Sequence, residues 1–303
     1  MATSEDLRAT ISNTEDLQSV VRTMKAMAAV RIRQYQEAVT SLEAYDHTIK
    51  LGLQIVLKQR YFAGHPLVLP SEQPSPPSEG KIGAIIIGSD QGLCGQFNQQ
   101  IAQCAIASLT ELQSNADNPC IAVVGQRVTP LLQNQGLSIT AQFTLPTAAT
   151  RIAPIVQDIL LAIEQWRTEQ QIERIFLFYN HFGGGASYHP RQLQLLPLDR
   201  NWLKQLQQKE WETKMLPTYT MNWQTLLSRL IREYLFVSLY RAFANSLASE
   251  NASRLAAMQS AQKNIEDQLS DLQAQYRRQR QSQITSELLD VVAGFEALTK
   301  NQS

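Results

Sequence analysis

The sequence predicts an α/β domain with a central Rossmann-like sheet, flanked by two long helices that pair as an antiparallel coiled coil. Residues 1–62 contain no proline and repeat apolar residues at helical spacing. Residues 81–215 alternate short β-rich runs with helical patterns, which favours a partly parallel sheet. Residues 216–303 have proline only at Pro217 and again repeat apolar residues at helical spacing.

The first segment, residues 1–62, is predicted to be one long helix. Most of its apolar residues lie three or four positions apart: Leu7, Ile11, Leu17, Val20, Val21, Met24, Met27, Ala28, Ile32, Tyr35, Val39 and Leu42. Residues 63–80 follow, and five prolines fall between Gly64 and Gly80. This composition predicts a semi-rigid, largely extended linker.

The middle segment, residues 81–215, is predicted to be the α/β domain. Its strand patterns are KIGAIII, CIAVVG, RIFLFYNHF and RQLQLLPL, with SITAQFT as a further candidate strand. Its helical patterns are FNQQIAQCAIASLTELQ, VTPLLQNQ and APIVQDILLAIEQWRTEQ.

The last segment, residues 216–303, is predicted to hold a second helix of about 75 residues, about 110 Å long at 1.5 Å per residue. A helix of this length must bury its apolar stripe against a partner, and the N-terminal helix is the obvious one. The stretch ASENASRLAAMQSAQ is rich in Ala and Ser, which lets two backbones approach closely. A coiled coil far longer than its domain is typical of a strut or a shaft.

Composition excludes several classes of protein. The chain has no net charge and only 18% charged residues, which argues against a nucleic-acid binder. Its three cysteines, Cys94, Cys104 and Cys120, have no CxxC spacing, so we expect neither a zinc site nor a disulfide framework. The polar N-terminus predicts no secretory signal, and no apolar run approaches the roughly 20 residues of a membrane helix.

The motif GSDQGLCGQFN, residues 88–98, places three glycines between a predicted strand and a predicted helix. That is the context of a phosphate-binding loop, but the spacing matches neither GxGxxG nor GxxxxGK[ST]. No lysine is present, and Asp90 would repel a phosphate. We therefore expect a structural turn and no cofactor. Cys94 could be a reactive thiol near a helix N-terminus, but a buried structural cysteine is the simpler interpretation.

Two further groups of residues could each form a functional site or serve only as ordinary surface structure. His181 and His189 flank FGGGASY and could form a metal pair or part of a hydrolase triad, yet no carboxylates, GxSxG or HExxH accompany them. A hairpin loop is favoured there, so we expect no catalytic residue and no metal site. The basic clusters, Arg22, Lys25, Arg31 and Arg33, then Arg277, Arg278 and Arg280, are either solvated faces or contacts for acidic loops of a partner.

Four stretches resemble one family, the gamma subunits of F-type ATP synthases. SDQGLCGQFN is similar to the family pattern SDRGLCGGFN, and NSLASENASRLAAM resembles ESxASExxARMxAM. RQRQSQITSELLDVVAGFEAL resembles RQxxITxELxEIVxGAxAL, and MKAMAAVRIRQYQ is a looser match to AMxMVAAxKxxxAQ. The four stretches occur in the family's order and extend over essentially the whole chain.

The resemblance implies a rotary motor subunit without an active site. The coiled coil would stand inside a ring of three alpha and three beta subunits, with the α/β domain against the epsilon subunit and the membrane c-ring. Ion flow, of protons or sodium, would turn the ring and the shaft, while ATP chemistry occurs between alpha and beta. The position implied is peripheral, at the cytoplasmic face of an energy-transducing membrane, without membrane insertion.

The resemblance also implies contact residues. By motif match, Arg280, Gln281 and Thr285 fall where the family's shaft meets a beta-subunit loop, and Met24 and Lys25 fall on the facing N-terminal helix. Val291, Phe295 and Leu298 belong to the apolar tip that would turn as a bearing within an apolar sleeve.

The chain departs from the family patterns at Gln91, where the pattern has Arg, and at Gln96, where it has Gly. These departures suggest a divergent member, from an alternative ATP synthase kept beside a housekeeping one. Two other classes remain open at this point: an enzyme with a nucleotide-binding α/β domain, and a free-standing coiled-coil scaffold.

Overall fold

The computed structural model describes residues 4–62, 81–112, 119–211, 213 and 215–300, with side chains of the last helix as far as residue 293. The predicted linker 63–80 lies outside the described residues. The chain forms two compact units, residues 28–254 and residues 1–27 with 255–303. These units divide within the two long helices, whereas the predicted segments 1–62, 81–215 and 216–303 follow helix ends. The larger unit therefore contains part of each long helix.

The N-terminal segment is two helices, α1 (Ser4–Ser41) and α2 (Glu43–Phe62), so the prediction of one helix over residues 1–62 was wrong. At Leu42 the backbone N–H bonds to Val39 three residues back, at 3.2 Å, and the Ser41 hydroxyl bonds to the carbonyl of Ala38. A tightened turn and a side chain that competes for a backbone carbonyl both interrupt regular α-helix.

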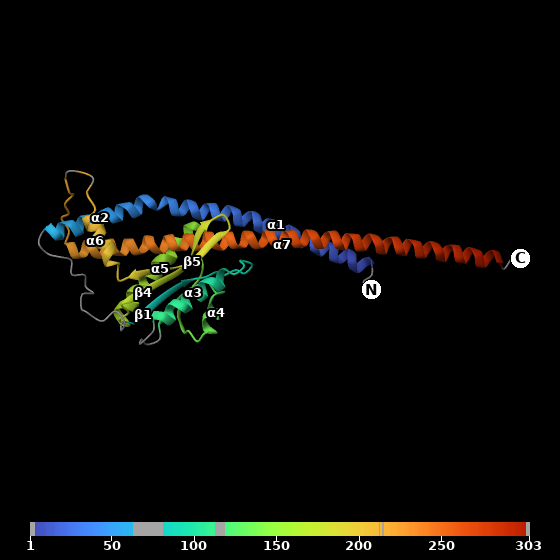
Figure 1. Cartoon of the computed structure of the whole chain (residues 1–303), viewed down its shortest axis with the longest axis horizontal. Coiled ribbons are helices and arrows are strands. Elements are labelled where there is room, and N and C mark those ends of the chain that lie inside the picture. The colour runs from blue at the N-terminus through green and yellow to red at the C-terminus, as the bar shows by residue number, and fades with distance from the viewer. Residues whose placement is uncertain (1–3, 63–80, 113–118, 212, 214, 301–303) are drawn as a thin grey trace. The chain divides into compact units, whose positions relative to one another are not determined.

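The sheet of the larger unit has five strands in the order β3-β2-β1-β4-β5. Strands β1, β4 and β5 are labelled in Figure 1. They are β1 (Ile82–Ile87), β2 (Cys120–Val124), β3 (Ile139–Phe143), β4 (Arg174–Gly184) and β5 (Ser187–Leu196). The first four are parallel, and β5 runs antiparallel to β4 at the edge. Every residue of β1 and β2 is buried, because helices cover both faces of a parallel sheet and its strands become apolar throughout.

Two apolar clusters lie on opposite faces of this sheet. On one face, Ile82 and Ile86 of β1 pack with α3 (Phe97–Leu112) and α4 (Thr129–Gln133). On the other face, Ile85 and Ile87 pack with α5 (Ile152–Glu169), which follows the short 3₁₀ helix Ala149–Arg151, and with α7 (Trp223–Lys300). The alternation of neighbouring isoleucines between the two faces follows from the two-residue period of a strand.

Helix α6 (Arg200–Gln208) was not predicted. The Asp199 carboxylate accepts a hydrogen bond from the backbone N–H of Asn201 at 2.8 Å, which caps the helix, and Leu203 is buried in a small cluster with Leu57 and Leu198. An aspartate before a run of helix-forming residues was the signal available in the sequence.

Helix α7 confirms the prediction of a very long C-terminal helix. It has 78 residues, which corresponds to about 117 Å at 1.5 Å per residue. The Asn222 side chain accepts a hydrogen bond from the N–H of Gln224 and caps its first turn. None of the helices among the described residues is long and apolar enough to cross a membrane.

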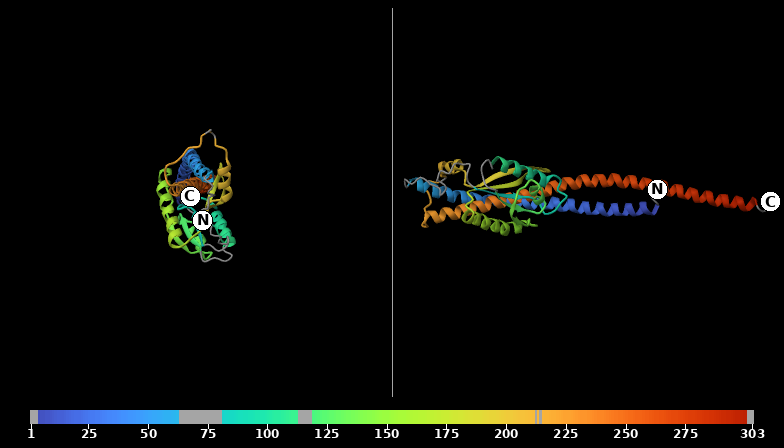
Figure 2. Two further views of the ribbon diagram at one scale, coloured as in Figure 1. Left: turned by 90° about the vertical axis from the view of Figure 1, so that its left-hand side faces the viewer. Right: turned by 90° about the horizontal axis from the view of Figure 1, so that it is seen from below.

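In the smaller unit, the N-terminal part of α1 lies along the C-terminal part of α7, antiparallel to it (Figures 1 and 2). The less exposed residues of α1 here are mostly three or four positions apart: Ser4, Leu7, Ile11, Thr14, Gln18, Val21, Met24 and Lys25. This is the heptad spacing of a coiled coil, so the predicted fold class is confirmed. Three residues of the predicted apolar stripe, Leu17, Val20 and Met27, are instead 50–58% exposed, because Thr14 and Gln18 take the seam positions.

Candidate functional site

The larger unit has the topology of a ligand-binding fold. In a sheet of order β3-β2-β1-β4-β5, the chain runs from β1 to β2 and β3 on one side and then crosses to β4 on the other side of β1. Ligands of open α/β sheets bind at such a reversal, in the crevice at the carboxyl ends of the two central strands, here β1 and β4. Here β1 is followed by the glycine-containing loop 88–98, and Asn180 lies in the last part of β4. A substrate or nucleotide site would therefore be sought beside this loop.

Helix α7 occupies that position. The Ser249 hydroxyl donates to the carbonyl of Asn180 at 3.1 Å, and the Ser253 hydroxyl donates to the carbonyl of Cys94 at 2.6 Å. Arg254 Nη2 donates to the carbonyl of Gly92 at 3.4 Å. We call residues 88–98, together with residues 249–254, the loop–helix junction. The crevice at the carboxyl end of the sheet is thus filled by the protein's own helix.

The glycines of the loop allow this close approach. Gly95 has a φ of +54°, and a Cβ atom there would lie 3.2 Å from Ser253 Oγ. A Cβ atom on Gly88 would lie 2.6 Å from the Val128 side chain. The interpretation of GSDQGLCGQFN as a structural turn is confirmed: its glycines let the loop turn and pack against neighbouring elements.

Side chains of the loop satisfy its own backbone. The Ser89 N–H donates to the Asn98 side-chain oxygen at 2.9 Å, and Asn98 donates back to the Ser89 hydroxyl at 2.8 Å. The Asp90 carboxylate accepts from the backbone N–H groups of Gln126 and Leu145, both at 2.9 Å. Asp90 therefore ties the loop to two neighbouring segments, whereas a phosphate loop keeps its N–H groups free for the ligand.

Cys94 is 3% exposed within the junction. Burial raises the pKa of its thiol, and the hydrogen bond with Ser89 offsets only part of that effect. A thiol with a raised pKa is a poor nucleophile at neutral pH. The interpretation of Cys94 as a buried structural cysteine is confirmed.

An ion pair is buried at the junction. Arg254 Nη2 lies 2.6 Å from Glu250 Oε1, and the two side chains are only 5–6% exposed. Burial raises the pKa of Glu250, while Arg254 and, more weakly, Arg31 act in the opposite direction. Arg254 also donates to the Asn251 side chain. The pair is held within a hydrogen-bonded network, which is the condition for a buried pair to be tolerated.

The departure from the family pattern at Gln91 lies beside this pair. Gln91 lines a cavity of about 40 Å³ together with Asp90, Glu250 and Arg31, a volume large enough for water. Gln91 is neutral, so in this cavity the cation facing the two carboxylates comes from Arg31 of α1. The structure gives no comparable explanation for Gln96, which is exposed.

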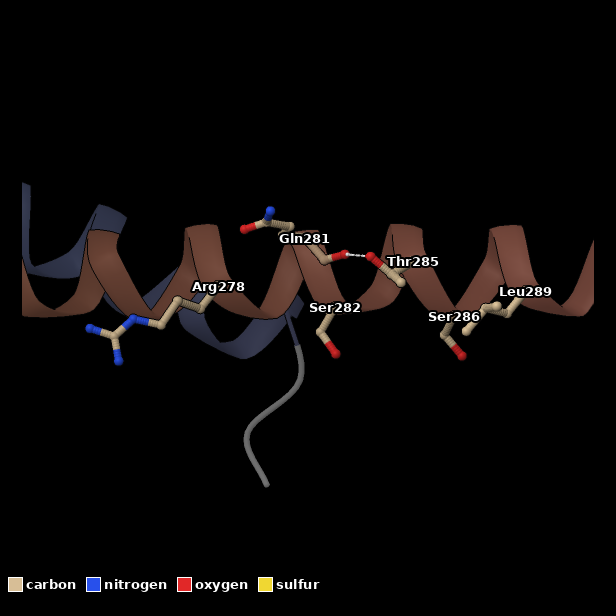
Figure 3. A pocket seen from close by; sticks show the side chains of 6 residues that line it. All are labelled: Arg278, Gln281, Ser282, Thr285, Ser286 and Leu289. Atoms are coloured by element: carbon tan, nitrogen blue, oxygen red, sulfur yellow. Dashed lines mark hydrogen bonds between the residues drawn. The ribbon is translucent and has the colours of Figure 1, made fainter.

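The predicted contacts with a beta subunit lie on the surface of α7. Gln281 and Thr285 belong to a shallow hollow lined by one helix only, with Arg278, Ser282, Ser286 and Leu289 (Figure 3). The Thr285 hydroxyl donates to the carbonyl of Gln281 at 2.8 Å, one turn back. Because a single helix lines it, this hollow encloses no ligand, and its side chains are available to a partner.

The other predicted contact residues lie elsewhere along the coiled coil. Met24 and Lys25 are half-buried, and Lys25 Nζ donates to the side chain of Gln262 at 3.1 Å. Gln262 and Arg280 are eighteen positions apart on α7, about 27 Å along the helix axis. The structure therefore divides the predicted contact residues between two levels of the coiled coil.

The apolar tip is open to solvent as far as it is described. Every residue from 281 to 293 is exposed, and Val291 is 71% exposed. The side chains of Phe295 and Leu298 lie outside the described residues. Four more large apolar residues of this segment are exposed: Ile284, Leu288, Leu289 and Val292.

His181 and His189 face each other across the β4–β5 hairpin, so the hairpin predicted around FGGGASY is confirmed. Their ring centres are 5.2 Å apart. Burial lowers the pKa of His181, with further contributions from Arg191 and His189. Among the described residues, no group of three or more His, Cys, Asp or Glu side chains could hold a metal ion.

Comparison with known proteins identifies the family of this chain. The family model described as ATP synthase matches residues 3–298, nearly the whole chain. The chain belongs to the ATP synthase family. Similar proteins of this family include the ATP synthase gamma chains of Glaesserella parasuis, 28% identical over 98% of this chain and 100% of the relative, and of Nitrosococcus oceani, 26% identical with the same coverage.

Solved ATP synthase structures share the fold. A chain of the Euglena gracilis mitochondrial ATP synthase, from an assembly of OSCP, F1 and c-ring, has a TM-score of 0.64 at 17% identity and covers 99% of this chain and 96% of its own. A chain from the Euglena gracilis rotor has a TM-score of 0.60 at 15% identity, covering 93% and 98%. The resemblance to gamma subunits is confirmed by the family match and by gamma chains that align from end to end.

The loop–helix junction was missed as a functional unit of this ATP synthase chain. Ser249, Ser253 and Arg254 lie in NSLASENASRLAAM, and their partners lie in SDQGLCGQFN. Both stretches were recognised as motifs of one family, yet their contact was not predicted. Two specific motifs in one chain, one of small polar residues on a helix and one of glycines in a loop, are the signal that could have suggested it.

Proposed function

We propose that this chain is the central rotor shaft of an F-type ATP synthase, which couples ion-driven rotation of the c-ring to conformational cycling of the catalytic beta subunits. Its relatives are named ATP synthase gamma chains, and the solved structures that share its fold come from rotor, central-stalk and c-ring assemblies. The coupling is allosteric, because each orientation of an asymmetric shaft favours a different conformation in each beta subunit.

The observation that carries this proposal is the exposed end of α7. Thirteen consecutive residues, 281–293, are exposed in the part of the chain that the structure describes, and five of them are large and apolar. An exposed apolar patch on a long, stiff helix is typical of a surface that meets a partner. An apolar surface with few charges suits rotation within a sleeve, since ion pairs would add points of attachment.

In this proposal, α7 and α1 contact the beta subunits at two different levels of the coiled coil. Arg280, Gln281 and Thr285 on α7 meet a beta-subunit loop, and Met24 and Lys25 on α1 contact the ring at a second level. Val291, Phe295 and Leu298 form the bearing tip. Arg280 is exposed and makes no ion pair within the described residues, which leaves its charge available to an acidic partner.

The chain itself has no catalytic residue in this proposal. Catalysis takes place between alpha and beta subunits, and the α/β domain serves as the foot that rests against the epsilon subunit and the c-ring. The crevice in which a related fold would bind a nucleotide contains Ser249, Ser253 and Arg254 of α7 instead. The chain is peripheral to the membrane, at its cytoplasmic face, and attached only through its partners.

Reconstitution tests the proposal directly. The chain, co-expressed with its alpha and beta subunits, should co-purify in a 3:3:1 complex with ATPase activity, while alpha and beta without the chain provide the control. A chain that stays alone in the presence of alpha and beta would favour a free-standing coiled-coil scaffold. ATPase activity or nucleotide binding by the chain alone would favour an enzyme.

We further propose that the complex is an alternative ATP synthase. Identities of 26–29% to gamma chains over their full length support a divergent member. The test is the set of genes beside the coding gene. Alpha, beta and c genes of ordinary sequence in the same operon would contradict this proposal and leave the shaft function untouched.

A further inference from the structure

The sequence alone predicts a hairpin without a metal site around His181 and His189. From the structure we propose instead that these two residues form a two-histidine site for a divalent transition-metal ion such as Zn²⁺, on the β4–β5 hairpin. The two residues are directly opposite each other in the antiparallel register of β4 and β5. Residues placed in this way have Cβ atoms about 5 Å apart, so two imidazoles on the same face of a hairpin can reach one ion.

The separation of the two rings fits a shared ion. Their centres are 5.2 Å apart and their planes are inclined by 61°. With a metal–nitrogen distance of about 2.1 Å and a ring centre about 1.1 Å behind the nitrogen, two imidazoles at the tetrahedral angle have centres about 5.2 Å apart. The strands therefore already hold the rings at the spacing that tetrahedral coordination requires.

Both imidazoles are free to act as ligands. Their contacts within the described residues are ring contacts, between the two histidines and between His181 and Tyr179. His181 Nδ1 is buried and has no hydrogen-bond partner there. An ion that keeps bound water cannot reach a fully buried nitrogen, so His181 would bind the ion through Nε2, the nitrogen that is not buried without a partner.

Two features limit the affinity. Arg191 interacts electrostatically with His181 and would repel a cation. No third His, Cys, Asp or Glu joins the pair among the described residues, so water completes the coordination shell. We therefore infer an exchangeable site of modest affinity, unlike a structural zinc site with four protein ligands.

Metal at this site would stabilise a hairpin that packs against the loop–helix junction. Tyr188, the residue before His189, has its hydroxyl 3.2 Å from Ser253 Oγ of α7, and its ring lies 5.8 Å from that of Phe97. An ion that binds the folded hairpin and not the unfolded chain raises the stability of the folded state. The hairpin is therefore where metal would stiffen the contact between the sheet and α7.

The test uses the tag-free full-length chain, with Zn²⁺ followed by calorimetry and Co²⁺ followed by its visible absorption. We expect one equivalent to bind, with a tetrahedral Co²⁺ spectrum and a Tm that rises with Zn²⁺ concentration. His189→Gln changes an exposed side chain and should lower the affinity about tenfold or more and abolish the Tm rise. His181→Gln should do the same.

His47→Gln is the matched control, because His47 is exposed on α2, away from the hairpin in the chain, and should leave binding unchanged. Binding that survives in the His189→Gln variant, or no binding to the unaltered chain at millimolar Zn²⁺, would overturn the proposal. Neither result bears on the shaft function, which is tested by assembly with alpha and beta.

Discussion

Two stretches of α7, equal in length, have opposite environments. Residues 242–254 are all buried, and residues 281–293 are all exposed. The buried stretch, AFANSLASENASR, has only Phe243 and Leu247 as large apolar residues, whereas the exposed stretch, QSQITSELLDVVA, has five. Burial within this helix therefore does not follow hydrophobicity.

The buried stretch has small side chains, which let neighbouring segments pack close to the helix, and its polar side chains form hydrogen bonds within the helix. The side chains of Asn245, Ser249 and Asn251 each bond to a backbone carbonyl one turn earlier in α7. Hydrogen bonds offset much of the cost of burying small polar side chains, although Ser246 Oγ and Arg254 Nε have no partner among the described residues. The buried stretch is therefore covered by other parts of the chain, whereas the exposed apolar stretch presents a surface suited to a partner.

Removing the cation of the buried Glu250–Arg254 pair should have the largest effect on stability. Arg254→Met keeps most of the side-chain volume but leaves Glu250 without its nearest cation. We expect a loss of about 3–5 kcal/mol in the free energy of unfolding, measured with urea, because an unpaired charge would remain buried. The double variant Glu250→Gln with Arg254→Met should recover part of the loss, since neither charge then remains. A loss under about 1 kcal/mol in the single variant would show that the pair is not buried as described.

A partly exposed ion network should give an intermediate effect. Asp46 of α2 accepts from Lys50 at 2.7 Å and from Arg241 of α7 at 2.9 Å. Burial alone raises the pKa of Asp46, but the hydrogen bonds from these two cations outweigh it and leave the pKa below its usual value. Asp46→Asn should cost about 1–2 kcal/mol at neutral pH, because the partners are about a third exposed and solvent weakens the pairs.

The pH dependence of Asp46→Asn has a definite sign. A carboxyl with a lowered pKa in the folded state stabilises the protein above its unfolded pKa of about 3.9 and loses that contribution as pH falls further. The difference between the original chain and the variant should therefore shrink below about pH 4 in urea titrations. A difference that grew towards low pH would contradict the lowered pKa.

The sequence predicts features that depend on local patterns and misses contacts between distant segments. The parallel strands and the length of α7 follow from apolar runs and helical spacing, which are local signals. The loop–helix junction does not, because Ser253 and Cys94 are 159 positions apart and small polar residues leave no periodic pattern. The coiled-coil seam was only partly predicted, since Thr14 and Gln18 hold seam positions that a search for apolar residues passes over.

A substitution in the exposed stretch should leave the stability of the isolated chain nearly unchanged and weaken assembly with partners. Leu288→Ser removes an apolar side chain that is 61% exposed in the isolated chain. We expect the free energy of unfolding of the isolated chain to change by less than about 0.5 kcal/mol, because little area is lost from a core. Assembly with alpha and beta should weaken, as measured by the yield of the complex. Gln283→Ala, on the same exposed stretch, serves as the control.

Arg280→Ala should have the smallest effect on the isolated chain, because an arginine without an ion pair contributes little to helix stability. Its unfolding curve should match that of the original chain within about 0.5 kcal/mol. In the complex with alpha and beta, the same variant should weaken coupling or assembly, since the partner's acidic loop loses its cation. Arg229→Ala, on α7 within the larger unit, is the control for removing an exposed arginine. Global unfolding of the Arg280→Ala chain would mean that this residue stabilises the coiled coil itself, and the comparison between the buried and exposed stretches of α7 would no longer hold.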